Sequence, residues 1–217
     1  MLSGATVGGR RLRRGLAGVA IACVTVSVVS CGDAKSSPGP AETTSTAGQS
    51  EVALVDLGDA NAVAGWTTVN DPVMGGKSTS QVTFGGGGLR FAGSISLENN
   101  GGFASARGPR DPDIGRRAAG ATALRVRALG DGKTYLLKLG VAGQPWSYVQ
   151  RFPTVAAVRQ NYDLPLAGFE PVGMRLDPEP TAPRTLDPSL VDQISLYILD
   201  EQQGPFEITV DGVDATR

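Results

Sequence analysis

After its first fifty residues, the chain alternates between apolar and polar side chains in short runs that turn-forming residues separate. In residues 206–210, the apolar side chains of Phe206, Ile208 and Val210 alternate with Glu and Thr. Residues 124–128 repeat this pattern, with two arginines between apolar neighbours. A period of two places one kind of side chain on each face of a strand. We therefore expect strands, each with one solvent-facing side, at 51–57, 81–84, 89–97, 103–107, 121–129, 134–141, 147–152, 158–164, 190–200 and 206–213.

Turn signals lie between these runs. The four glycines at 85–88 can close a hairpin, because glycine adopts a positive φ without steric cost. Further turn signals are the Asn-Asn-Gly-Gly sequence at 99–102 and the Gly-Asp-Gly sequence at 130–132. No segment of the chain after residue 30 keeps a helical period over three turns. About ten strands at this spacing predict an all-β fold of the sandwich type.

The first thirty residues are organised like a lipoprotein signal peptide. An arginine cluster at 10–14 precedes an uncharged apolar stretch at 15–29, and Val-Val-Ser-Cys at 28–31 has the order of a lipobox. The apolar stretch of about 15 residues is short for a membrane span, which needs roughly 20. We predict that residues 1–30 are removed and that Cys31 becomes the lipidated N-terminus, and an uncleaved membrane anchor is the alternative. The paired arginines leave twin-arginine export open, although the general export route fits better.

Residues 31–50 are rich in Ser, Thr, Pro, Gly and Ala and contain no aromatic side chain. Such a composition cannot bury enough apolar surface to order itself, so we predict a flexible tether from Cys31 to one folded domain at 51–217. A flexible chain of about twenty residues has a mean reach of roughly 25 Å. Lipid on Cys31 would hold the domain at the outer face of a bacterial cytoplasmic membrane.

Charge and composition exclude several classes of function. Without the leader, the chain carries 16 basic and 21 acidic side chains and no evident basic patch, so we predict no nucleic-acid partner. The chain has no histidine, which removes the usual general base, the Ser-His triad and the commonest metal ligand. Its two cysteines, Cys23 and Cys31, both precede the domain, which therefore has no disulfide, thiol nucleophile or cysteine metal site.

A glycine-rich tract carries the most specific motifs of the chain. The tract begins at Trp66 and includes NDPVMGGKS at 70–78 and LENNGGFASAR at 97–107. It resembles the signature of the complex I intermediate-associated protein 30 family, and the resemblance extends over nearly all of 51–217. Further residues that match the family are LRV at 124–126, GDGK at 130–133, Tyr135, Tyr148, Phe152, Leu164, Pro165, Phe169 and QGPF at 203–206.

The resemblance implies a galactose-binding-like jelly roll, in agreement with the expected β-sandwich. Eukaryotic members of the family assist the assembly of respiratory complex I inside mitochondria, so the resemblance implies assembly or scaffolding of a membrane protein complex. Lipid on Cys31 would, however, place this domain across the membrane from the compartment that corresponds to the mitochondrial matrix. The chain departs from the family at Tyr162, where the family usually has Trp, and at 173–175, which matches a Gly-Arg motif only loosely.

The two polar, glycine-rich clusters of the tract are candidate contacts for a protein partner. Glycines let a partner approach the backbone, and methionine adapts to varied surfaces. In an alternative interpretation, the glycines and asparagines only lock turns, and Arg107 pairs with Asp71 inside the sandwich. The candidate residues are Asp71, Met74, Gly75, Gly76, Ser78, Asn99, Asn100, Gly101, Gly102, Phe103 and Arg107.

Carbohydrate binding is the alternative function that the fold class suggests. Sugar-binding modules lay aromatic rings against sugar faces and hold hydroxyl groups with polar side chains. Trp146 and Tyr148 would point to the same side of a strand, with Arg151 close by, so the three are candidates for a saccharide platform. Core or edge packing of the two rings is the other interpretation.

Catalysis is the least favoured class of function. Without histidine, acid–base chemistry rests on carboxylates, and a glycosidase needs two of them roughly 5–10 Å apart. Asp71 and Glu98 could form such a pair, but Asp71 could equally bond its own turn while Glu98 is a solvated acid. We predict no enzyme activity and no cofactor. Structural calcium near Asp111 or Asp113 stays open, although their spacing is not that of an established calcium loop.

Overall fold

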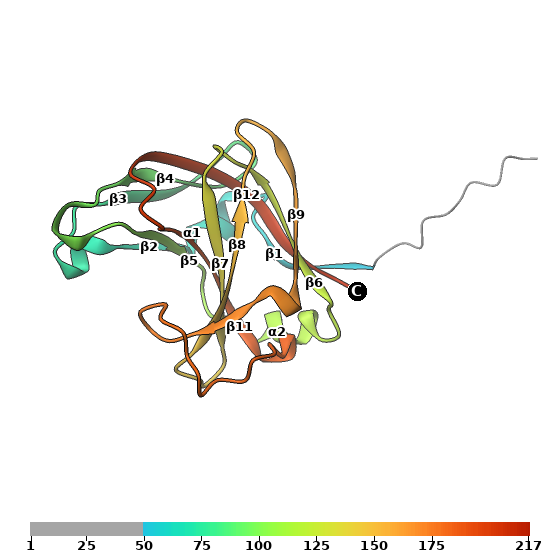
Figure 1. Cartoon of the computed structure of the whole chain (residues 1–217). Coiled ribbons are helices and arrows are strands. Elements are labelled where there is room, and N and C mark those ends of the chain that lie inside the picture. Colours follow the sequence, from blue (N-terminus) through green and yellow to red (C-terminus); the bar gives the residue numbers. More distant parts are fainter. Residues whose placement is uncertain (1–49) are drawn as a thin grey trace, which may run out of the picture. The chain divides into compact units, whose positions relative to one another are not determined.

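A computed structural model of the protein describes residues 50–217. The predicted signal peptide, Cys31 and the tether up to residue 49 lie outside these residues. The described residues form two antiparallel sheets of six strands each, packed as a sandwich (Figure 1). The strands are β1 (Glu51–Asp56), β2 (Thr67–Asn70), β3 (Thr79–Gly85), β4 (Gly88–Ile95), β5 (Ala104–Arg107), β6 (Ala123–Leu129), β7 (Thr134–Val141), β8 (Ser147–Pro153), β9 (Arg159–Pro165), β10 (Glu170–Val172), β11 (Val191–Ile198) and β12 (Gly204–Thr216).

Short helices connect some of the strands. Helix α1 begins where Asp59 accepts hydrogen bonds from the amides of Asn61 and Ala62 at 2.7 and 3.0 Å, an N-cap that the first helical turn requires. Within the described part of the chain, no helix is long and apolar enough to cross a membrane. The helices are α1 (Ala60–Ala64) and α2 (Asp113–Ala118), with 3₁₀ turns η1 (Asp71–Met74), η2 (Glu98–Asn100), η3 (Leu166–Gly168) and η4 (Pro188–Leu190).

The first sheet is built around its longest strand, β12. Its order is β3-β4-β12-β6-β9, and β1 also pairs with β12. Strands β3 and β4 form a hairpin closed by Gly86 and Gly87, whose φ angles of 61° and 81° only glycine adopts easily. This finding confirms the hairpin expected at residues 85–88.

The second sheet has the order β10-β8-β7-β11-β5-β2. Inward-facing side chains of the two sheets form one continuous core, in which the Phe91 and Phe206 rings meet edge-to-face at 4.9 Å. A smaller apolar cluster packs separately from this core and is centred on Leu136, Val149 and Tyr197. The second sheet is thus partly apolar on both of its faces.

Strand β12 links the two ends of the sandwich. Its first residue, Gly204, pairs with Ile95 at the end of β4, and its last, Thr216, pairs with Glu51 at the start of β1. The loops after β2 and β4 therefore lie at one end of β12, and the entry point of the described chain lies at the other. Figure 1 shows the C-terminus and the start of β1 on the side opposite to these loops.

All ten expected strands are present, which confirms the all-β sandwich. Strands β2 and β10 were not expected from the sequence. They are only four and three residues long, and Pro171 interrupts the strand-forming composition of β10. Both lie at edges of the second sheet, where pairing on one side stabilises even a short strand.

Candidate functional site

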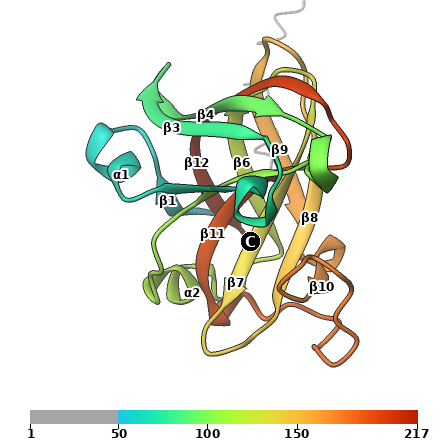
Figure 2. The same ribbon diagram turned by 90° about the vertical axis from the view of Figure 1, so that its left-hand side faces the viewer.

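Two loops meet at the end of the sandwich that Figure 2 faces: residues 71–78, after β2, and residues 97–103, after β4. We call them together the loop tip. The Asp71 carboxylate joins the two loops. It accepts hydrogen bonds from the amide and hydroxyl of Ser78 at 2.8 and 2.5 Å, and from two consecutive amides of the second loop at 2.6 and 3.2 Å. Because Asp71 is only 1% exposed, it acts as a buried anchor.

The hydrogen bonds determine the charge state of Asp71. Burial alone would raise the pKa of its carboxyl group. The bonds from the Ser78 side chain and from the amides of Gly102, Ser78 and Phe103 outweigh burial and hold the pKa below its ordinary value. The carboxylate is therefore ionised at neutral pH, and this charge strengthens each of the four bonds.

Two glycines allow the loops to approach the carboxylate closely. A Cβ atom on Gly76 would lie 2.5 Å from the Asp71 carboxyl carbon, and one on Gly101 would lie 2.7 Å from its Oδ2. Both distances are far below ordinary contact, so side chains at these positions would displace the anchor. These two candidates of the sequence analysis are thus needed for the packing of the loops.

Four other candidates set the backbone conformation of the tip. Asn99 and Asn100 have φ angles of 56° and 57°, and Gly75 and Gly102 have φ angles of 90° and 133°. Asn99 also donates its side-chain amide to the Gly75 carbonyl at 3.1 Å, which joins the loops a second time. The turn-locking role considered for these residues is confirmed by their geometry.

The outer surface of the tip carries exposed apolar side chains. Val73 and Met74 are 72% and 66% exposed, and Leu97 on the other loop is also exposed, whereas Phe103 is half-buried. Lys77 and Glu98 form an ion pair across the two loops at the same surface. The tip therefore presents exposed apolar side chains on a tightly bonded backbone, beside a charged pair.

Arg107 does not pair with Asp71. The expectation that these two residues form an ion pair inside the sandwich is therefore wrong. Its Nε donates to the hydroxyl of Ser105 at 3.2 Å, and its guanidinium lies 5.6 Å from the centre of the Tyr197 ring. Strand β5 carries Arg107 away from the tip, on the face of the sheet opposite to the core residues Ala104 and Ala106. No cluster of Asp71 with Arg107 exists for a ligand to contact.

The expected saccharide platform is also wrong. Tyr148 is 3% exposed, and its hydroxyl donates to the Pro183 carbonyl at 2.6 Å, so its ring cannot lie against a sugar. Trp146 is half-buried and packs against the same core. Arg151 forms a bidentate pair with Asp200, with bonds of 2.7 and 2.8 Å. The core-packing interpretation of these aromatic residues holds.

The acidic candidates are all held by other residues. Asp71 is too buried to reach a bound glycoside, and Glu98 pairs with Lys77, so the two do not form a catalytic pair across a cleft. Asp111 and Asp113 pair with Arg117 and Arg116. Over residues 50–217, no group of three or more acidic, cysteine or histidine side chains is placed to hold a metal ion.

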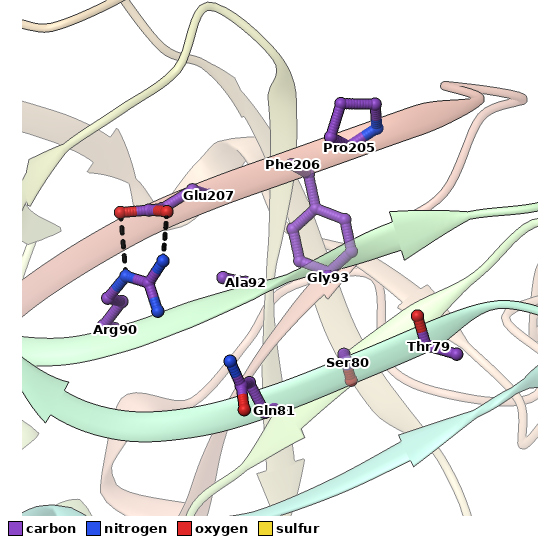
Figure 3. A pocket seen from close by; sticks show the side chains of 9 residues that line it. All are labelled: Thr79, Ser80, Gln81, Arg90, Ala92, Gly93, Pro205, Phe206 and Glu207. Carbon is purple, nitrogen blue, oxygen red and sulfur yellow. Dashed lines mark hydrogen bonds and ion pairs between the residues drawn. The ribbon is translucent and has the colours of Figure 1, made fainter.

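A groove that the sequence analysis did not single out lies on the outer face of the first sheet. It has a volume of about 450 Å³, and both polar and apolar residues line it (Figure 3). Arg90 of β4 and Glu207 of β12 form a bidentate pair along it, with bonds of 2.9 and 2.5 Å, and Gln81 of β3 lies nearby. These residues come together only through strand pairing, so local sequence pattern gives no signal for them.

Comparison with known proteins places the chain in a family. The sequence model of Complex I intermediate-associated protein 30 (CIA30) matches residues 55–210. The chain belongs to this family. The match spans both loops of the tip and confirms the resemblance that their motifs indicated. No curated protein shows significant similarity to the chain.

Two solved structures share the architecture of this CIA30 domain. The family 11 carbohydrate-binding module of the cellulosomal cellulase Lic26A-Cel5E of Clostridium thermocellum has a TM-score of 0.54 at 14% identity, covering 80% of this chain and 97% of that chain. A family 11 module from Clostridium thermocellum in complex with a beta-1,3-1,4-mixed-linked tetrasaccharide has a TM-score of 0.52 at 15% identity, covering 76% and 94%. At such identities the likeness establishes the fold, a galactose-binding-like jelly roll, for the CIA30 domain.

Proposed function

We propose that the protein is a non-catalytic binding module at the cell envelope, and that its loop tip binds a membrane protein complex whose assembly it assists or scaffolds. The observation that carries this proposal is the exposure of Val73 and Met74 on the first loop, which the buried Asp71 holds against the second loop. Membership of the CIA30 family supports the choice of a protein complex as the partner.

Exposed apolar side chains on an ordered backbone favour a protein partner on physical grounds. Covering a valine or methionine side chain on binding is worth roughly 1.5–3 kcal/mol. Because the Asp71 network already orders both loops, little conformational entropy is left to lose when a partner docks. The exposed Lys77–Glu98 pair adds charged groups to the same loops, and protein–protein interfaces combine an apolar core with polar groups.

Anchoring is the second part of the proposal. The lipobox-like residues 28–31 support lipidation of Cys31, and hence a position on the outer face of the cytoplasmic membrane. Cells grown with a labelled fatty acid should incorporate it into the wild-type protein and not into Cys31→Ala. A variant that is labelled as strongly as the wild type would contradict the anchor without bearing on the loop tip.

Partner binding is tested on the full-length protein in its own membranes. After mild solubilisation and native electrophoresis, the wild-type protein should migrate in a high-mass assembly. Met74→Ser should shift the protein to the monomer position. Met174→Ser is the control, because Met174 is also an exposed methionine (88%) but lies on another loop, and this variant should migrate like the wild type. Equal migration of both variants, or a wild-type monomer, would contradict the proposal.

Carbohydrate binding is the second candidate, and the groove beside Arg90 and Glu207 favours it. Polar side chains of this kind can hold sugar hydroxyls, and the two structural relatives are carbohydrate-binding modules. A melting-temperature screen against cell-envelope saccharides should then give a shift that Glu207→Gln removes and Glu170→Gln, on the other sheet, retains. A shift that survives Glu207→Gln would exclude this groove.

A further inference from the structure

A row of aligned residues crosses the outer face of the second sheet. Ser195 of β11 pairs with Arg107 of β5 on one side and with Lys138 of β7 on the other. Strands lie about 4.8 Å apart, so the two cationic residues stand roughly 10 Å from each other at the backbone, with only a serine between them. Both side chains lie over the Tyr197 ring. Arg107 Cζ is 5.6 Å and Lys138 Nζ is 5.5 Å from the centre of the ring.

No carboxylate of residues 50–217 pairs with either of these two cations. Arg107 donates its Nε to the Ser105 hydroxyl, and neither Arg107 nor Lys138 has an ion-pair partner in the described domain. On the outer face of the first sheet, in contrast, arginines are matched with acids, in the pairs Arg90–Glu207, Arg125–Asp163 and Arg127–Asp214.

The lack of a counter-charge has an energetic consequence. Burial lowers the pKa of Lys138, and the nearby charges of Arg107 and Arg110 lower it further. Arg110 itself pairs with Asp192, so this neighbouring acid is already engaged. The Tyr197 ring attracts each cation but supplies no counter-charge. An anion placed between Arg107 and Lys138 would relieve their repulsion.

We propose that Arg107 and Lys138, on either side of Ser195, form a binding site for an oxyanion, the carboxylate or phosphate group of a ligand. The planar guanidinium of Arg107 can donate two parallel hydrogen bonds from its terminal nitrogens, and Lys138 supplies a point charge opposite. Ser195, which is 3% exposed, lies on the strand between them, and the Tyr197 ring lies beside both cations. This site is separate from the loop tip, and its test does not involve the proposed protein partner.

The test is an NMR titration of the full-length protein carrying ¹³C-labelled lysine, which has only four lysines to resolve. Inorganic phosphate and glutarate are added separately at constant ionic strength, because salt alone screens surface charges. The Lys138 signal, assigned with Lys138→Met, should move saturably, and its pKa should rise toward the ordinary value. Tighter binding of phosphate would identify a phosphate ligand, and tighter binding of glutarate a carboxylate ligand.

Two variants make the result specific. Arg107→Gln should weaken binding about tenfold or more, as expected for loss of hydrogen bonds to a charged group. Lys133→Met removes the same kind of charge from the turn just before β7 and should leave binding unchanged. The proposal is overturned if the Lys138 signal shows no saturable change, or if both variants weaken binding equally.

Discussion

Ser78 donates both its backbone amide and its hydroxyl to the carboxylate of Asp71, seven residues before it in the chain. The same hydroxyl accepts a bond from the Ser96 amide at 3.0 Å, so one serine connects the first loop to the carboxylate and to the end of β4. The loop tip is therefore held from within by ionic hydrogen bonds, while its surface side chains stay free for contact.

Removing the charge of Asp71 should loosen both loops. Asp71→Asn places an amide against four donors, and we expect a loss of about 1.5–3 kcal/mol in the free energy of unfolding, the range for hydrogen bonds to charged groups. Urea denaturation at pH 7 measures the effect. Glu98→Gln, which removes an exposed carboxylate from the same tip, should cost less than about 0.5 kcal/mol. Equal losses would contradict a special role for Asp71.

The contribution of Asp71 should depend on pH in a defined direction. Its folded-state pKa lies below the ordinary 3.8, so its stabilising effect is complete above that value and is lost as pH falls through the lower folded-state pKa. The stability gap between wild type and Asp71→Asn should be constant from about pH 5 to 8 and shrink below about pH 4. Urea titrations at several pH values measure the gap, and one that widens on acidification would refute the assignment.

Gly76→Ala should destabilise the tip by overpacking. The added methyl group would lie 2.5 Å from the Asp71 carboxyl carbon, and we expect a loss of about 1–3 kcal/mol in unfolding free energy. Gly65→Ala is the matched control, because its φ is −79° and the nearest atom, on Pro109, is 3.6 Å away. Thermal unfolding should show a clear decrease only for the variant at Gly76; equal decreases would argue against the close approach.

Tyr148→Phe should release the segment at 173–187 without unfolding the domain. Its hydroxyl bond to the Pro183 carbonyl is worth about 1 kcal/mol, so cleavage by trypsin after the exposed Arg184 should become several times faster. Tyr135→Phe removes another buried hydroxyl, one that bonds to Asp131, and should leave the cleavage rate near that of the wild type. Unchanged cleavage in Tyr148→Phe would show that the bond does not hold the segment.

The regular strands could be predicted from the sequence because their alternation is local. In β6, for example, Leu124, Val126 and Ala128 are buried and the two arginines between them are partly exposed, as the period of two indicated. The family could likewise be predicted, because its motifs are contiguous. The short edge strands β2 and β10 could not, since what stabilises them is pairing with strands distant in the sequence.

The site residues were harder to assign for the same reason. Tyr148 has the expected orientation along its strand, but only the packing of the second sheet shows that this face is the core. Arg107 follows the tip motif directly, yet β5 carries it to the outer face, where its paired neighbours come from β11 and β2. The local sequence pattern identifies candidate site residues, whereas the order of the strands in each sheet determines which residues each candidate contacts.

The course of β12 also sets how the protein can be tagged and displayed. Thirteen residues at about 3.3 Å each span roughly 40 Å, and Arg217 at the end of this strand donates its amide to Ser50, beside the start of β1. A fluorescent protein or affinity handle fused after Arg217 would therefore crowd the side from which the chain enters the domain. The opposite side would stay unobstructed, so C-terminal fusions suit imaging and pull-down of a partner at Val73 and Met74.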